Sequence, residues 1–141
     1  MVEAVALGVT EEELAAAESA PLLGAVLAAF SQLNITAHWL SAMTASHFLE
    51  RRNYGRIVRN DGFSARYREK MVSELKIDPS LLISSNVHVE ADMDHSDTIW
   101  DAIEQHVVDD HTYRLALEGA EGCALVDRAY RAALAHEMRL R

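Results

Sequence analysis

The sequence contains little of what strands, disulfides and membrane-spanning helices require. Its 141 residues include six Gly, two Pro and one Cys. Scarce Gly and Pro, together with abundant Ala and Leu, favour helices over strands. The single cysteine, Cys123, excludes a disulfide within the chain and is typical of a protein kept in a reducing cytoplasm. No run of about 18 apolar residues is present, so we expect no helix that crosses a membrane.

Positive charge is also scarce, because 22 acidic residues outnumber 13 Lys and Arg and leave a net charge of −9. A nucleic-acid-binding protein needs a basic surface to displace phosphate counterions, so we expect no nucleic-acid partner. Eight of the 13 basic residues nevertheless fall between Arg51 and Lys76. This cluster is either a solvated helix face and turn or a basic patch for a carboxylate substrate or an acidic partner.

Half of the residues are hydrophobic, enough for a core, and their spacing predicts an all-α protein of about five or six helices in one domain over residues 1–141. The chain offers start signals at Thr10 with Glu13, at Pro21, at Asp78 before Pro79, and at Asp110. The expected helices span about residues 10–18, 21 to a break at 34–36, 37–52, 64–75, 84–107 and 112–138.

The chemistry-bearing segment is the run His88-Val89-Glu90-Ala91-Asp92-Met93-Asp94-His95. In a helix, residues at i, i+4 and i+7 lie within roughly 60° of one another, so His88, Asp92 and His95 share a face. The same face continues into Ile99 and Ile103, which predicts that it points into the core. Ionisable groups on a core face are costly unless something pairs them, and imidazole and carboxylate at this spacing can bind a divalent metal.

The preceding helix offers a second carboxylate, Glu50, on a face that also carries His47, Met43, Leu40 and Trp39. Glu50 is a candidate metal ligand, and His47 is a packed residue, a hydrogen-bond partner of a ligand or an alternative ligand.

Three alternatives to the metal site stay open. His88, Asp92 and His95 can form a hydrogen-bonded buried network, or they belong to an amphipathic face whose angle differs from the expected one. Glu50 can form a salt bridge with an arginine among Arg51, Arg52 and Arg56. No serine elbow, phosphate-binding Gly loop or CxxC pair offers a different chemistry.

The runs HVEADMDHSD and AMTASHFLE, which ends at Glu50, resemble the haem-oxygenase-like di-iron oxidases and oxygenases, relatives of the thiaminase II and PQQ-synthesis folds. The resemblance implies a helical bundle in which Glu50, His88, Asp92 and His95 ligate iron. It also implies a further Glu and His on earlier helices, which this sequence lacks. We therefore expect the C-terminal part of such a bundle, and the chain is truncated, one half of a split enzyme, or a homodimer.

The resemblance further implies a non-haem oxidoreductase that uses Fe(II) and O2 to oxidise a small organic substrate, such as an amino acid or fatty acid derivative. Two Fe(II) ions are expected if another chain or missing N-terminal helices complete the site. The partner is then a second copy or another subunit that covers an open apolar face. Two other functions remain: a non-catalytic helical partner subunit or small-molecule-binding module, and a metal-free, thiaminase-like enzyme.

Overall fold

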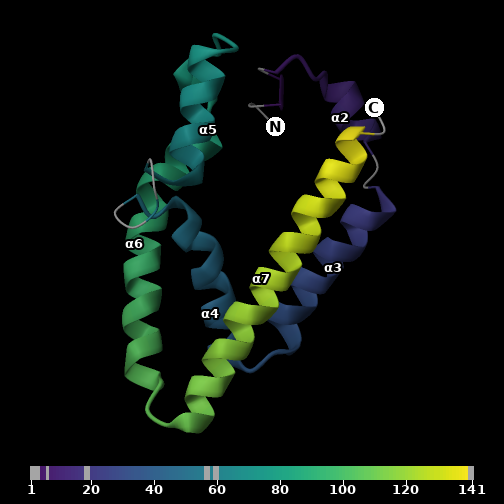
Figure 1. The fold of residues 1–141 in the computed structure, drawn as a ribbon. Helices are drawn as coiled ribbons and strands as arrows, with labels where there is room; N and C mark the ends of the chain where they lie inside the picture. Colours follow the sequence, from purple (N-terminus) through teal and green to yellow (C-terminus); the bar gives the residue numbers. More distant parts are fainter. Residues whose placement is uncertain (1–3, 6, 18–19, 56–57, 59–60, 140–141) are drawn as a thin grey trace. The chain divides into compact units, whose positions relative to one another are not determined.

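The computed structural model describes residues 4–5, 7–17, 20–55, 58 and 61–139, and these contain six α-helices, two short 3-10 helices and no strand (Figure 1). The α-helices are α2 (Glu11–Ala16), α3 (Pro21–Thr36), α4 (Trp39–Glu50), α5 (Gly62–Ser73), α6 (Ile83–His106) and α7 (Asp110–Arg139). The 3-10 helices are η1 (Arg51–Asn53) and η3 (Pro79–Leu81). The predicted all-α class, with five or six helices, is confirmed.

The chain forms two compact units, Met1–Glu18 with Glu50–Ser96 and Ser19–Leu49 with Asp97–Arg141. The first holds α2, η1, α5, η3 and the start of α6, and the second holds α3, most of α4, the end of α6 and α7. The expectation of one domain over residues 1–141 stays a prediction.

Helix start signals were mostly predicted correctly. Thr10 caps α2, and its side chain and that of Glu13 exchange hydrogen bonds with each other's backbone N–H. The Asp78 side chain accepts from the Ser80 N–H at the start of η3. The predicted cap Asp110 is wrong by one residue, because Oδ1 of Asp109 accepts the Thr112 N–H at 2.8 Å. The expected end of the first helix at Glu18 lies outside the described residues.

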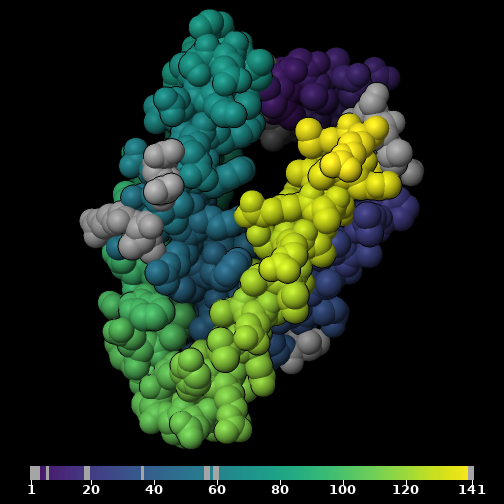
Figure 2. Space-filling view, viewed as in Figure 1, coloured from purple at the N-terminus to yellow at the C-terminus, as the bar shows by residue number. Residues whose placement is uncertain are grey.

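In the second unit, α7 packs along α3 (Figures 1 and 2). It also contacts α4, where the Ser41 hydroxyl donates to the Leu115 carbonyl at 2.7 Å. Gly119 lies at this crossing, and a Cβ there would come within 2.0 Å of the Ser41 carbonyl oxygen. The glycine that weakens the middle of α7 by its helix propensity is therefore what permits close approach to α4.

Two predicted apolar faces point inward only in part. On α3, Val26 is buried, whereas Leu22 and Leu27 are about half exposed. On α4, Leu40 is fully buried but Trp39 is 48% exposed, with its ring edge-on to the ring of His106. None of the helices among the described residues combines the length and the apolar character that a membrane crossing requires.

Candidate metal site

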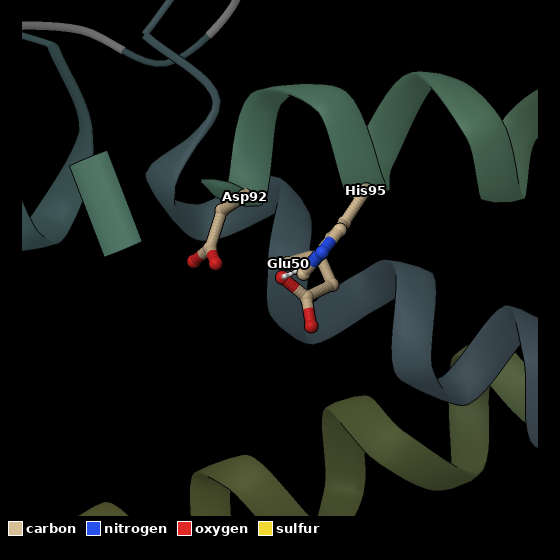
Figure 3. Close-up of side chains that lie close together, drawn as sticks. All are labelled: Glu50, Asp92 and His95. Carbon is tan, nitrogen blue, oxygen red and sulfur yellow. Dashed lines mark ion pairs between the residues drawn. The ribbon is translucent and has the colours of Figure 1, made fainter. Parts of the chain in front are cut away.

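Three of the predicted ligands, Glu50, Asp92 and His95, lie together within the first unit. Glu50 is the last residue of α4, and Asp92 and His95 follow one another at i and i+3 on α6. Residues three apart on a helix are neighbours on its surface. Asp92 and His95 on α6 therefore lie close to Glu50 at the end of α4 (Figure 3).

The ligand atoms of these three side chains all lie within 4.8 Å of one another. Two carboxylates and one imidazole form a donor set that suits a divalent cation. The three residues differ in their exposure to solvent. Asp92 is 3% exposed, and the side chains of Glu50 and His95 are 28% and 61% exposed. A cation at this point would have a buried carboxylate on one side and solvent access on the other.

One oxygen of Glu50 is buried and has no hydrogen-bond partner. This oxygen, Oε2, lies 3.8 Å from Nδ1 of His95, an ion-pair distance that is too long for a hydrogen bond (Figure 3). Buried acceptors are normally satisfied, so this orphaned oxygen fits a site that binds a metal.

The electrostatics agree with this fit. Burial raises the pKa of the Glu50 carboxyl above its ordinary value, and the neighbouring Asp92 carboxyl raises it further, while His95 and His88 oppose the shift. Two carboxylates close together resist being ionised at the same time. A divalent cation between them removes that repulsion.

His88, the fourth predicted ligand, contacts Asp92 and stands outside the three-residue group. Its Nδ1 lies 2.8 Å from Oδ1 of Asp92, one helical turn further along α6, and its side chain is 50% exposed. This contact is one hydrogen bond of the kind expected if His88, Asp92 and His95 formed a hydrogen-bonded network in place of a metal site. The prediction that His88 itself ligates a metal remains untested.

The expectation that His88, Asp92 and His95 all face the core is wrong for the two histidines. The buried residues of α6 follow one stripe, which consists of Ser85, Asp92, Ser96 and Ile103. At roughly 100° per residue, His88 and His95 lie about 60–80° to one side of this stripe. Asp92 is therefore buried, and the two imidazoles lie at its solvent-exposed edge.

The other residues considered near Glu50 also have definite places. His47 is buried, and its ring centroid lies 5.5 Å from that of Trp100, which agrees with a packed residue. Within the described residues the ion pair found for Glu50 is the one with His95. Arg56, one of the arginines considered as a salt-bridge partner, lies outside them.

Sequence reasoning missed Asn53. The side chain of this buried residue donates from Nδ2 to Oδ2 of Asp92 and accepts the Ser64 N–H on Oδ1 at 2.8 Å. Asn53 and Asp92 are 39 residues apart, and no local pattern links them.

No family model, curated protein or solved structure matches this chain. The arguments for its function therefore come from its own residues.

Proposed function

We propose that this chain binds a divalent metal through Glu50, Asp92 and His95, and that it is an iron-dependent oxidase or oxygenase acting on a small organic substrate. The observation that carries the metal site is the convergence of ligand atoms from three side chains within 4.8 Å of one another, together with the buried Oε2 of Glu50 that has no hydrogen-bond partner. The choice of iron rests on the resemblance of the His88 to His95 run to helical di-iron proteins and on a donor set that suits Fe(II).

Each residue has a chemical part in this proposal. Glu50 and Asp92 offset the charge of the cation, and His95 adds a neutral nitrogen donor. Three protein donors do not fill the coordination sphere of an octahedral ion, so positions remain for substrate and O2. A bound Fe(II) ion supplies the redox chemistry, while the chain supplies orientation and electrostatics.

The number of ions follows from the number of donors. The described residues bring together three donors, which suits one ion. A second iron would need ligands beyond these three. We therefore expect close to one ion per chain for this polypeptide alone, and more only in an assembly that completes the site.

The test is metal content after anaerobic loading with Fe(II), followed by O2 consumption. We expect iron in the parent and its loss in Asp92→Asn and His95→Ala. Asp94→Asn is the matched control, because it removes an exposed carboxylate from the same helix without touching the site. A parent that takes up no iron would refute the metal site. Iron uptake without O2 consumption alongside any substrate tried would refute the oxidase proposal and leave a metal-binding module.

A further inference from the structure

Asn53 lies where three elements of the first unit meet. It ends η1, donates its side-chain N–H to Asp92 on α6, and accepts the backbone N–H of Ser64 in the first turn of α5. The residue is 8% exposed, so both hydrogen bonds are shielded from water. Hydrogen bonds of this kind hold a side chain in one orientation.

The orientation of the Asn53 amide is set by its partners. A backbone N–H can only donate, so the atom facing Ser64 must be the amide oxygen. The NH2 group consequently faces Asp92 and can only donate to it. Asn53 thus presents a fixed donor to Oδ2 of Asp92, while His88 occupies Oδ1.

This arrangement restrains the Asp92 carboxylate but leaves some of its acceptor positions free. An ionised carboxylate offers about four acceptor positions on its two oxygens. Asn53 and His88 occupy one position on each oxygen, which leaves one on each for a cation. The carboxylate cannot rotate without breaking a buried hydrogen bond.

The backbone of α5 is packed tightly against the same residue. Gly62 has φ +88°, and a Cβ at this position would lie 2.8 Å from the backbone carbon and oxygen of Asn53. Only glycine fits both the conformation and the space. The first turn of α5 is therefore held against Asn53, and with it the Ser64 N–H that orients the amide.

We infer that Asn53 is a positioning residue of the metal site, which acts through Asp92 and is itself no ligand. The inference rests on the proposed metal-binding function. Residues that hydrogen-bond a metal ligand fix its orientation, and their loss typically weakens metal binding about 10–100-fold. Asn53→Ala leaves the three ligands in place and removes the donor that holds one of them.

The experiment compares two quantities in the full chain: the Kd for Fe(II), measured anaerobically against a chromogenic chelator, and the Tm of the metal-free protein. Asn53→Ala is compared with Asn86→Ala. Asn86 lies on α6, the helix that carries Asp92, but its side chain donates to the Pro79 carbonyl and not to Asp92. Asn53→Ala loses the hydrogen bonds to Asp92 and Ser64, and Asn86→Ala loses the one to Pro79. A purely structural role would lower the Tm and leave the Kd of the folded protein unchanged.

We expect Asn53→Ala to raise the Kd by about tenfold or more, with Asn86→Ala close to the parent. If Asn53→Ala does not fold, Asn53→Ser takes its place, because its hydroxyl remains near the Ser64 N–H but is too short to reach Asp92. An unchanged Kd, or an equal rise in the Asn86 variant, would overturn the positioning role while leaving the metal site standing. A parent that binds no Fe(II) would overturn both.

Discussion

Nδ1 of His88 lies 2.8 Å from Oδ1 of Asp92, so the first histidine of the predicted ligand row is a hydrogen-bond partner of the aspartate. The contact joins two residues one turn apart on α6. It orients the imidazole and engages one oxygen of the buried carboxylate. Its presence distinguishes His88 from His95, whose Nδ1 is directed toward Glu50 (Figure 3).

The two histidines should therefore differ in their effect on metal binding. His95→Ala removes a ligand, and we expect loss of stoichiometric Fe(II). His88→Ala removes a partner of Asp92, and we expect the Kd for Fe(II) to rise by about 10–100-fold while saturating iron still binds. The measurement is an anaerobic Fe(II) titration with His136→Ala, an exposed histidine, as control. Equal losses in both variants would mean that His88 ligates the metal.

The raised pKa of Glu50 predicts how stability depends on pH in the metal-free protein. Because the pKa is higher in the folded chain, the folded state binds this proton more tightly than the unfolded state. The resulting stabilisation is complete below the ordinary carboxyl pKa and is lost as the pH rises through the raised value. Asp92 contributes to the shift, and a cation at the site would oppose it.

Glu50→Gln replaces the ionisable carboxyl by a neutral group of the same shape. In the absence of metal, we expect its Tm to exceed that of the parent near neutral pH, and the difference to shrink as the pH falls. Thermal unfolding in chelator-treated buffers between acidic and neutral pH measures this. With Fe(II) present at neutral pH the order should reverse, because only the parent keeps the ligand. A parent that is more stable than Glu50→Gln at neutral pH without metal would contradict the assignment.

Gly119 should be the least replaceable glycine in the second unit. In Gly119→Ala the new Cβ would approach the Ser41 carbonyl oxygen and the Thr44 hydroxyl to 2.0 and 2.3 Å, so α4 and α7 must separate. We expect destabilisation of about 3 kcal/mol, at the upper end for overpacked cores. Gly24→Ala on α3 is the control, because a Cβ there meets nothing within 4 Å. It should stabilise by about 0.5–1 kcal/mol. Urea unfolding of both variants measures the two free energies of unfolding. Similar values would contradict the close contact of α4 and α7 at Gly119.

Local signals in the sequence predicted the helices well, because capping and periodicity act over a few residues. The expected helix at about 84–107 is α6, Ile83–His106, and the capping box at Thr10 is present. The error at Asp110 is of the same local kind, because two successive aspartates offer equivalent caps and backbone geometry selects Asp109.

Tertiary contacts were predicted less well. Glu50, Asp92 and His95 were found because residue type and helical spacing narrow the choice of ligands. The burial of the individual side chains was not predicted. The row His88, Asp92 and His95 spreads over roughly 60° of α6, so it includes both the centre and the edge of the buried side of the helix. Asn53 carried no signal, because its role depends on contacts with Ser64 and Asp92, 11 and 39 residues away.

Two substitutions of Asp92 should separate its structural part from its part as a ligand. In Asp92→Asn the side-chain oxygen can still accept from Asn53, and the amide can donate to Nδ1 of His88 once the imidazole takes the tautomer with its proton on Nε2. The charge that repels Glu50 also disappears. We therefore expect metal-free stability close to that of the parent, with Fe(II) binding lost. Asp92→Ala instead leaves the Asn53 Nδ2 group buried without a partner, at a cost of about 1–3 kcal/mol. Urea unfolding and Fe(II) content of both variants provide the measurement. If Asp92→Asn retained iron at the parent's level, Asp92 would hold the fold together and bind no metal.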